Sequence, residues 1–443
     1  MRGVVGKDLT DEFVYQLGRG IGTFFRRHSV RRASIGRDAR ESSPIFRDLL
    51  IRGLNESGID TIDCGMIATP VLYFTLFTED VDGGVMITGS HNPADNNGFK
   101  ICLGKSTIFG EQIFQIRDII QAGKFESGSG KATTREVVAK YSDNIVSNVK
   151  LGKRKIKVVV DSGNGMGGIV AVPIYQRLGC EVIELFTEPD SAFPNHHPDP
   201  TVVENMRFAV DAVGKHKADL CIAFDGDADR IGVVDEAGRI IWGDQLMVIY
   251  SRSILKERPG ATFISEVKAS QTLFDDVRKH GGNAIMWRVG HSPIKAKMKE
   301  TGAAMAGEVS GHQFFADRYF GFDDAIYAGA RLLEILSNFD GPVSSLLDGL
   351  PKTVTTPEIR VECPDSIKFD LVSQLTEEFK KTNEVVDIDG ARIKFEHGWG
   401  LVRASNTQPV LVLRFEADTD AHLKEIRDIV EGRAKQLIAS QNH

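Results

Sequence analysis

Apolar residues in the first part of the chain alternate between helical and strand spacing. The first helix pattern starts after Thr10, whose hydroxyl can cap it. Its apolar face consists of Phe13, Val14, Leu17, Ile21 and Phe24. A strand pattern at 33–38, a helix pattern at 44–58 and a second strand pattern at 59–65 follow. This order predicts a βαβ unit.

The same pattern restarts twice farther along the chain. Each restart is a strand, a helix and a strand, at 155–165, 171–179 and 180–186 and again at 261–267, 270–282 and 283–289. A polar, proline-bearing segment at 346–358 is typical of a linker. Beyond it, a strand pattern at 409–417 and an amphipathic helix pattern at 418–438 predict a smaller α+β unit.

We therefore predict the α/β fold class for this chain of 443 residues: three similar α/β domains followed by an α+β domain. The predicted domains are 1–136, 137–238, 239–350 and 351–443. Hydrophobic residues make up 42% of the chain and charged residues 26%, which is typical of a soluble protein. Because no apolar run of about 18 residues is present and residues 1–13 lack the apolar part of a secretory signal, we expect a cytoplasmic protein without a membrane partner.

The net charge and the spacing of the cysteines exclude several classes of partner and site. The formal net charge of -7 argues against a general affinity for nucleic acid or anionic membranes, so any phosphate binding is expected to be local. We interpret the basic run at 26–32 as a solvated helix end. The five cysteines are scattered singly, which argues against a disulfide framework or a zinc knuckle.

Two polar loops stand out in the first half of the chain. In TGSHNP (88–93), Ser90 lies between a glycine and a histidine, in a segment that favours neither helix nor strand. In FDGDADRIG (224–232), three aspartates occupy alternate positions after an apolar strand pattern. Residues two apart in an extended backbone point to the same side, so we expect Asp225, Asp227 and Asp229 to converge on Mg²⁺ or Ca²⁺.

An EF-hand is the alternative for the aspartate loop, because Glu236 falls at loop position twelve. It fails because Arg230 occupies position six, where that loop needs glycine, and because strand patterns flank the segment. An acidic surface loop without a metal is the other alternative. The apolar strand patterns on both sides argue against it.

Two further loops lie in the second half of the chain. In GEVSGH (307–312), Glu308, Ser310 and His312 alternate, and an extended backbone would present all three from one edge to sugar hydroxyls. A capping or turn role is equally compatible with this segment. In RASNTQP (403–409), one guanidinium, short polar side chains and backbone N–H groups are suited to a phosphate dianion, although a simple polar loop remains an alternative.

Two other motifs suggest different chemistry. Gly163, Gly165 and Gly168 fit G-x-G-x-x-G, with Glu184 about twenty residues on, as in nicotinamide-binding domains. That interpretation leaves the other loops unexplained. The adjacent His196 and His197 could suggest a metal, but neighbours on an extended chain point to opposite faces, so we favour a role in ordering the loop.

Taken together, TGSHNP, DGDADR, GEVSGH and RASNTQP, in this order, resemble the four signature loops of the α-D-phosphohexomutase family. The resemblance covers essentially the whole chain, and DSGNG at 161–165 is also a regular family feature. GEVSGH, with EVKAS and WRVGHS, is most similar to the bacterial phosphomannomutase/phosphoglucomutase branch. The phosphoglucosamine branch usually has a glutamine where Val309 stands.

The resemblance implies a fourth domain similar to the TATA-binding-protein fold, a central cleft, and reversible phosphoryl transfer between O1 and O6 of mannose or glucose phosphate. It implies a phosphoserine at Ser90 and a hexose 1,6-bisphosphate as intermediate and activator. The implied ligands of Mg²⁺ are Ser90, Asp225, Asp227 and Asp229. Small-molecule sugar phosphates are the implied partners.

The resemblance also assigns roles to further residues. His91, Lys100 and Arg230 are the expected cationic neighbours of the phosphoryl group. The candidates for the acid/base step are His291, a Lys100 with a lowered pKa, and His312. The remaining residues of the expected substrate site are Arg2, Lys268, Glu308, Ser310, Arg403, Ser405, Asn406 and Thr407.

One departure and three alternatives remain. Family members usually begin with a Y-D-I-R-G turn at the cleft, whereas this chain begins Met1-Arg2-Gly3, so the arginine is kept and the tyrosine is absent. The first alternative is a phosphoglucosamine or N-acetylglucosamine phosphate mutase. The others are a non-catalytic sugar-phosphate binding protein, which would not need Ser90, and a nicotinamide-dependent oxidoreductase.

Overall fold

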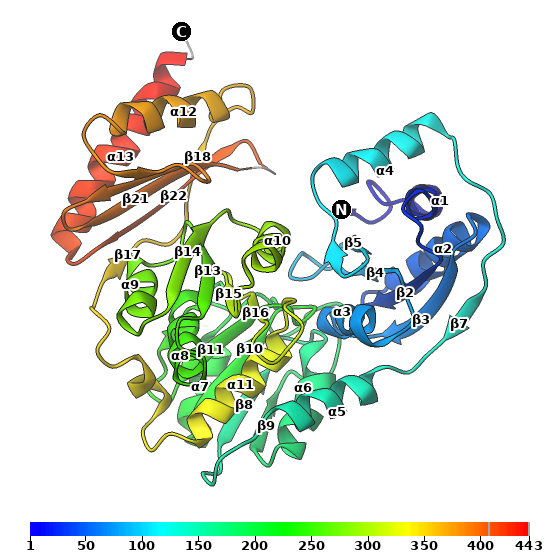
Figure 1. Ribbon diagram of the computed structural model, residues 1–443, viewed down its shortest axis with the longest axis horizontal. Helices are drawn as coiled ribbons and strands as arrows, with labels where there is room; N and C mark the ends of the chain where they lie inside the picture. The colour runs from blue at the N-terminus through cyan, green and yellow to red at the C-terminus, as the bar shows by residue number, and fades with distance from the viewer. Residues whose placement is uncertain (406–407, 442–443) are drawn as a thin grey trace.

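The computed structural model describes residues 1–405 and 408–441. The strands within these residues form four sheets (Figure 1). The predicted substrate residues Asn406 and Thr407 lie outside the described residues. Among the described helices, none is both long and apolar enough to cross a membrane.

The first domain is built on a seven-stranded mixed sheet with strand order β1-β5-β4-β2-β3-β7, in which β6 pairs with β5. Its strands are β1 (Arg2–Val4), β2 (Arg32–Arg37), β3 (Asp60–Met66), β4 (Gly83–Ile87), β5 (Asn96–Leu103), β6 (Ser106–Thr107) and β7 (Ala132–Thr134). Its helices are α1 (Asp11–Arg27), α2 (Ser43–Glu56), α3 (Thr69–Thr78) and α4 (Glu111–Ala122). As predicted, Thr10 caps α1 by accepting the N–H of Phe13 at 3.2 Å.

The second domain has a five-stranded sheet with order β12-β11-β10-β8-β9. Its strands are β8 (Lys157–Asp161), β9 (Glu181–Leu185), β10 (Leu220–Phe224), β11 (Ile231–Asp235) and β12 (Ile240–Ile241). Its helices are α5 (Val138–Asn148), α6 (Gly167–Arg177) and α7 (Arg207–His216). Strands β10 and β11 form an antiparallel hairpin, so the aspartate loop lies at its tip.

The third domain has the sheet order β14-β13-β15-β16. Its strands are β13 (Thr262–Glu266), β14 (Asn283–Trp287), β15 (Met305–Gly307) and β16 (Gln313–Phe315). Its helices are α8 (Gly243–Glu257), α9 (Gln271–Lys279), α10 (His291–Thr301), α11 (Ala325–Ser337) and the short η1 (Val343–Leu347). One apolar core extends from α3 of the first domain through the second domain into the third.

The fourth domain is an antiparallel sheet with order β17-β22-β21-β20-β19, in which β18 also pairs with β22. Its strands are β17 (Val354–Thr355), β18 (Ile359–Glu362), β19 (Val385–Val386), β20 (Ala391–Phe395), β21 (Gly398–Ala404) and β22 (Val410–Ala417). Helices α12 (Lys368–Phe379) and α13 (Asp420–Gln441) pack on this sheet and share its separate core. Part of the predicted linker is therefore strand β17.

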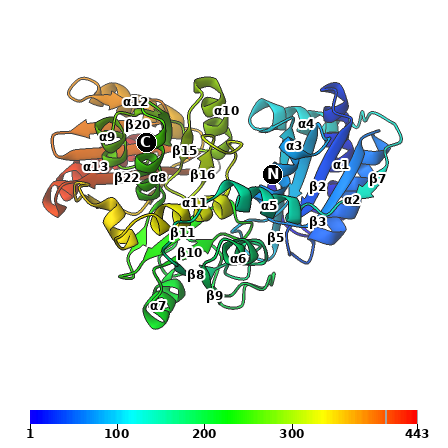
Figure 2. The same ribbon diagram turned by 60° about the horizontal axis from the view of Figure 1, so that its bottom comes forward.

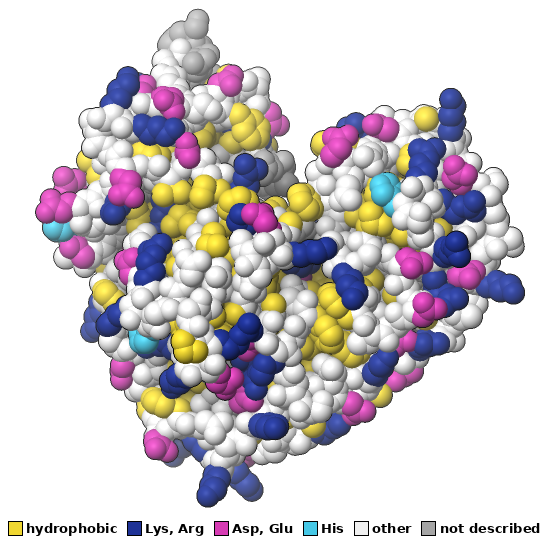
Figure 3. All heavy atoms as spheres, in the orientation of Figure 1, with side chains coloured by type: hydrophobic (Ala, Val, Ile, Leu, Met, Phe, Trp, Pro, Cys, Tyr) yellow, Lys and Arg dark blue, Asp and Glu magenta, His cyan; other side chains and the backbone are white. Residues whose placement is uncertain are grey.

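The four domains are arranged as a V (Figures 1 and 2). The first domain forms one arm, the fourth domain forms the end of the other, and the second and third domains lie between them. The space-filling view shows a deep notch between the arms (Figure 3). The sheets and helices confirm the predicted α/β fold class with a distinct fourth domain. The domain boundaries at 136, 238 and 350 and the likeness of the fourth domain to the TATA-binding-protein fold stay predictions.

Candidate active site

Ser90 lies just after β4 in a strained backbone conformation. Its φ of 49° is in the left-handed region, which is uncommon for a residue other than glycine. The Ser90 hydroxyl donates to Oδ2 of Asp225 at 2.7 Å, and its oxygen lies 3.1 Å from Nδ1 of His91. Because the residue is only 2% exposed, this geometry is fixed by its surroundings.

Arg40, which the sequence analysis did not select, fixes the Ser90 loop. Its buried guanidinium donates to the carbonyl oxygens of Ser90 at 2.9 Å and Asn92 at 2.6 Å. It also donates to Pro93 O at 2.5 Å and Asn96 O at 2.7 Å. Asp38 pairs with Arg40 at 3.3 Å and accepts the N–H of Gly89 at 3.0 Å. The available signal was the charged sequence GRDAR at the end of β2, because β2 and β4 are parallel neighbours and their ends lie at the same side of the sheet.

The three aspartates converge at the tip of the β10–β11 hairpin. Asp225, Asp227 and Asp229 are buried, and one carboxylate oxygen of each lies within 4.8 Å of the others. The expectation of an extended backbone was wrong: Ala228 has φ 61°, and its N–H donates to Asp225 O at 3.1 Å. The acids therefore meet because the chain turns. Glu236 accepts from Ser344 Oγ at 2.5 Å, apart from this cluster, which agrees with the rejection of an EF-hand.

The aspartate donors fit a hard divalent cation. Asp227 Oδ1 is buried and has no hydrogen-bond partner among the described residues, and Asp229 Oδ1, also buried, faces Nε2 of His312 at 3.3 Å. Burial and the two neighbouring carboxylates raise the pKa of Asp225, which indicates that the cluster needs positive charge. All three residues offer oxygen ligands, which suit Mg²⁺.

Lys100 on β5 supplies positive charge to the same cluster. Its ammonium donates to Oδ2 of Asp227 at 2.7 Å and also contacts Asp229. Burial alone would lower the pKa of Lys100, but the two carboxylates raise it above its ordinary value. The expectation of a lowered lysine pKa was therefore wrong. Thr69 at the start of α3, another residue that sequence reasoning missed, donates to Asp227 Oδ2 at 2.5 Å.

The imidazole of His91 was expected to be cationic but is neutral in the structure. Burial and the nearby Arg230 lower the pKa of His91 to about 3, so its imidazole is neutral at pH 7. Arg230 instead carries charge: burial opposes it, but Asp225 and Asp229 raise its pKa. The cations next to Ser90 and the aspartates are thus Lys100 and Arg230.

The GEVSGH segment is a tight turn between β15 and β16, so the expected extended row of side chains was wrong. Gly311 has φ 97°, and Glu308 N–H donates to His312 O at 2.9 Å. The turn brings Nδ1 of His312 within 3.0 Å of Oε2 of Glu308, and Ser310 Oγ lies 3.3 Å from the same nitrogen. Nε2 of His312 lies 3.3 Å from Oδ1 of Asp229, which connects this turn to the aspartate loop.

His291 begins α10 and lies beside this turn. Its ring centroid is 5.7 Å from that of His312, and its Nδ1 lies 3.6 Å from Oδ2 of Asp323. Burial and the nearby ammonium of Lys295 lower the pKa of His291 to about 3, so the imidazole is neutral at pH 7. Asp323 and Lys295, which pair at 2.8 Å, were not selected from the sequence.

Two of the expected substrate residues, Arg403 and Lys268, lie at the margins of this cluster. Arg403 is the next-to-last residue of β21 and pairs with Asp389 at 3.2 Å, and Asp389 accepts the N–H of Val289 at 3.0 Å. This carboxylate therefore connects the RASNTQP loop with the segment before His291. Lys268 lies 3.7 Å from Glu266 in the third domain and 3.5 Å from Glu358 in the fourth.

Ser405 and Arg2 complete the described part of the expected set. Ser405 Oγ accepts the N–H of Gln408 at 3.2 Å. Arg2 lies in β1, which pairs with β5, and donates to Asn92 in the Ser90 loop at 3.2 Å. Within the described ranges, Arg2, Lys268 and Arg403 form hydrogen bonds with residues other than Ser90 and the aspartates, so any joint role requires a shared ligand.

The glycine-rich and histidine motifs order neighbouring loops. Gly165 lies against the aspartate loop, where a Cβ would stand 2.8 Å from Gly226 O. His196 Nε2 lies 3.0 Å from Asp161, and His197 contacts the carbonyl oxygen of His91 in the Ser90 loop. These contacts confirm the predicted loop-ordering role of the two histidines and give the glycines a packing reason.

Comparison with known proteins supplies the family. Models of the phosphoglucomutase/phosphomannomutase α/β/α domains I, II and III match residues 1–127, 139–238 and 242–354, and the model of the family's C-terminal domain matches 358–432. The chain belongs to the phosphoglucomutase/phosphomannomutase family. This confirms the resemblance drawn from the four loops.

Relatives within the phosphoglucomutase/phosphomannomutase family cover nearly the whole chain. A phosphoglucomutase of Neisseria gonorrhoeae is 46% identical over 100% of this chain and 96% of the relative. A phosphomannomutase/phosphoglucomutase of Pseudomonas aeruginosa strain PAO1 is 43% identical over 99% and 95%. A crystal structure of a family protein from Burkholderia thailandensis has a TM-score of 0.93 at 43% identity, covering 98% of this chain and 96% of that one.

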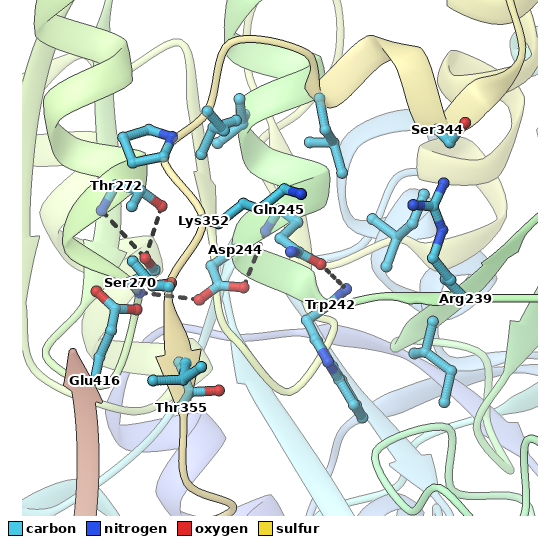
Figure 4. Close-up of a pocket in the computed structure, with 18 of the residues that line it drawn as sticks. Arg239, Trp242, Asp244, Gln245, Ser270, Thr272, Ser344, Lys352, Thr355 and Glu416 are labelled. Atoms are coloured by element: carbon cyan, nitrogen blue, oxygen red, sulfur yellow. Dashed lines mark hydrogen bonds between the residues drawn. The ribbon is translucent and has the colours of Figure 1, made fainter. Parts of the chain in front are cut away.

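A cavity beside the fourth domain of this family member is separate from the site. It has a volume of about 710 Å³ and lies between the start of α8 and the segment 347–355 (Figure 4). Figure 4 shows Asp244, Ser270 and Glu416 at one end and Arg239 and Ser344 at the other. None of its described lining residues is among the expected catalytic residues.

Proposed function

We propose that this chain is a phosphohexomutase that reversibly transfers a phosphoryl group between O1 and O6 of a hexose phosphate. The hexose is mannose, glucose or both. The observation that carries the proposal is the buried hydrogen bond of 2.7 Å from the Ser90 hydroxyl to Asp225, at the junction of the first two domains. The backbone of Ser90 is strained at this point. A structural serine would not need three further buried acids beside it. Names of the full-length relatives support the same activity.

The aspartates are proposed to hold Mg²⁺ together with an oxygen of phosphorylated Ser90. When bound, Mg²⁺ neutralises negative charge that develops during phosphoryl transfer. Asp225, Asp227 and Asp229 supply its protein oxygen ligands. Lys100 and Arg230 add fixed positive charge from β5 and from the hairpin. Catalysis then depends on positioning and electrostatics, as expected for a loose phosphoryl-transfer transition state.

The transfer exchanges one P–O bond for another. In the forward step the bond between Ser90 Oγ and phosphorus breaks and a bond from phosphorus to O1 or O6 of the sugar forms. The electron pair of the broken bond stays on Ser90 Oγ, which takes up a proton from solvent and becomes a hydroxyl again. The sugar hydroxyl loses its proton, for which the neutral imidazole of His291 is the proposed acceptor. The product is a hexose 1,6-bisphosphate, which reorients and returns its other phosphoryl group to Ser90.

Reorientation requires one position for whichever phosphate is not reacting. Arg403 and Ser405, with Asn406 and Thr407 of the same loop, are proposed to bind it, and Lys268 and Arg2 are proposed to assist. Glu308 and Ser310 are proposed to hold sugar hydroxyls, because their turn lies between the aspartate loop and the segment that contacts Asp389. His312 connects Glu308 with Asp229.

The test compares wild type with Ser90→Ala and with Ser147→Ala, an exposed serine on α5. Mutase turnover is measured with Mg²⁺ and a trace of glucose 1,6-bisphosphate on glucose, mannose and glucosamine 1-phosphates, and intact mass reports phosphorylation. We expect Ser90→Ala alone to abolish turnover and the phosphorylated mass. Near wild-type turnover by Ser90→Ala would contradict the mechanism, and a preference for glucosamine 1-phosphate would instead support a phosphoglucosamine mutase.

A further inference from the structure

A second group of metal-ligating side chains lies on the fourth domain. His397 is in the turn between β20 and β21, Asp418 directly follows β22, and His422 is in the first turn of α13. One potential ligand atom of each lies within 4.8 Å of the others. The proposed mechanism uses none of these three residues.

The backbone holds the three side chains together. Strands β21 and β22 pair from Gly398 opposite Ala417, and Asp418 N–H extends the pairing by donating to His397 O at 3.1 Å. Thr419 Oγ1 accepts the N–H of His422 at 3.3 Å and thereby fixes the start of α13. The ends of paired strands β21 and β22 and the start of α13 therefore hold the three residues in place.

The side chains share one carboxylate. Nδ1 of His397 lies 3.1 Å from Oδ2 of Asp418, and Nδ1 of His422 lies 2.6 Å from Oδ1. The two imidazoles stack, with ring centroids 3.9 Å apart and an interplanar angle of 6°. The hydrogen bond from His422 lowers the pKa of Asp418, so the carboxylate is ionised at neutral pH.

We propose that His397, Asp418 and His422 form a surface site for a divalent transition metal ion, with Zn²⁺ as the representative ion. Two imidazole nitrogens and one carboxylate oxygen are ligands that suit Zn²⁺, Ni²⁺ and Cu²⁺, whereas Mg²⁺ and Ca²⁺ favour oxygen ligands. The site is thus chemically distinct from the all-carboxylate group at Asp225, Asp227 and Asp229.

The distances are compatible with chelation once the two imidazoles rotate out of their stacked arrangement, because an ion must lie in the plane of each ring that ligates it. At Zn–ligand distances near 2.1 Å, two ligands of a tetrahedral ion lie about 3.4 Å apart. Each imidazole nitrogen is already within 3.1 Å of a carboxylate oxygen, and all three ligand atoms lie within 4.8 Å. The side chains of His397, Asp418 and His422 are 45%, 51% and 33% exposed, so they can rotate and water can complete the coordination.

Zn²⁺ binding to the full chain tests the site. The protein, without a polyhistidine tag and stripped of metal, is titrated with Zn²⁺ by calorimetry in the presence of excess Mg²⁺, which keeps the oxygen-only cluster occupied. We expect His397→Asn and His422→Asn each to weaken one binding event about tenfold or more, and the double variant to lose it. His280→Asn is the matched control, because His280 is also an exposed histidine paired with an aspartate, Asp276, but has no second histidine beside it.

A spectroscopic measurement identifies the ligands independently. Electron paramagnetic resonance of the protein loaded with Cu²⁺ is expected to show coupling to two imidazole nitrogens, and the double variant is expected to lose that signal. The proposal is overturned if the double variant binds Zn²⁺ with wild-type stoichiometry and affinity, as binding at the group of Asp229, His312 and Asp323 would predict. It is also overturned if wild type binds no more Zn²⁺ than the double variant.

Discussion

At Arg40, one buried guanidinium holds four carbonyl oxygens of the loop that carries Ser90. We expect Arg40→Ala to lower kcat about 10²-fold, because a displacement of about 1 Å in a reacting group can have an effect of that size. Arg40→Lys should be intermediate, since an ammonium keeps the charge but cannot reach all four acceptors. Steady-state kinetics and the phosphorylated fraction by intact mass provide the measurements.

The control for Arg40 is Arg52→Ala. Arg52 is 65% exposed and pairs with Glu56 on the surface of α2, so its removal should leave kcat unchanged. A wild-type kcat for Arg40→Ala would show that the Ser90 loop keeps its conformation without these hydrogen bonds.

The residues of the candidate site were predictable from sequence where they belong to one short loop with a characteristic set of side chains. Ser90 and the three aspartates are such residues, and the aspartates do converge, although through a turn rather than an extended strand. Arg40 and Thr69 were missed because their partners lie 50 and 158 residues away, so only tertiary structure relates them. Charge states also depend on packing, which is why the pKa shifts of His91 and Lys100 were opposite to expectation.

At the scale of elements, the tip of the β10–β11 hairpin packs directly on the Ser90 loop. A Cβ at Gly226 would overlap the carbonyl oxygen of Ser90. We therefore expect Gly226→Ala to separate the two loops and to lower kcat by about 10²-fold or more. Gly214→Ala on α7 is the matched control, because a Cβ there meets nothing within 4 Å and alanine favours a helix. Equal activities for the two variants would contradict the proposed contact.

Asp324 makes the stability of α11 depend on pH. Its carboxylate caps α11 by accepting the N–H of Tyr327 at 2.8 Å and also accepts the hydroxyls of Tyr141 and Tyr319. Burial raises its pKa from 3.8 to about 6. Because the folded state binds this proton more tightly than the unfolded state, the stabilisation is full below pH 4 and is lost as pH rises through about 6.

Asp324→Asn removes this titration while keeping a side chain that can cap the helix. We expect wild type to lose about 2 kcal/mol relative to the variant between pH 4 and pH 7, because the shift at 1.36 kcal/mol per pKa unit gives about 3 kcal/mol in all and part of it is already lost at pH 4. Urea unfolding followed across that range gives the measurement. Parallel stability curves for the two proteins would contradict the raised pKa.

Secondary structure was predictable where a local signal sets it. The cap at Thr10 and the helical spacing after it place α1, and the apolar run before Asp225 places β10. The turn at 308–312 was not predictable in the same way, because alternation of side chains in GEVSGH matches an extended strand as well. Its reversal depends on Gly311 lying against Ile231 of the neighbouring hairpin, which is a tertiary contact.

At the scale of the whole molecule, the fourth domain is attached to the third through a small apolar cluster of Val267, Trp399 and Leu401 and through buried polar contacts. Arg392 on β20 donates to Val267 O at 2.5 Å and Ala269 O at 2.8 Å, on either side of Lys268. Its guanidinium stacks 3.7 Å from the centroid of Trp399. Glu416 on β22 accepts the N–H of Gln271 at 3.1 Å next to the cavity of Figure 4. These contacts set where Arg403 lies relative to Glu308.

We therefore expect Arg392→Met to raise KM for the hexose phosphate about tenfold. Leaving buried carbonyl oxygens unpaired costs about 1–3 kcal/mol, and 1.4 kcal/mol corresponds to a factor of ten in affinity. Phosphorylation of Ser90 should stay at the wild-type level, because Ser90, Arg40 and the aspartates belong to the first two domains. Arg427→Met on α13 is the control, since Arg427 is 45% exposed and pairs with Glu431 within its own helix. A parallel loss of phosphoserine in Arg392→Met would mean that the fourth domain also shapes the Ser90 loop, whereas an unchanged KM would mean that Arg392 does not position the phosphate loop.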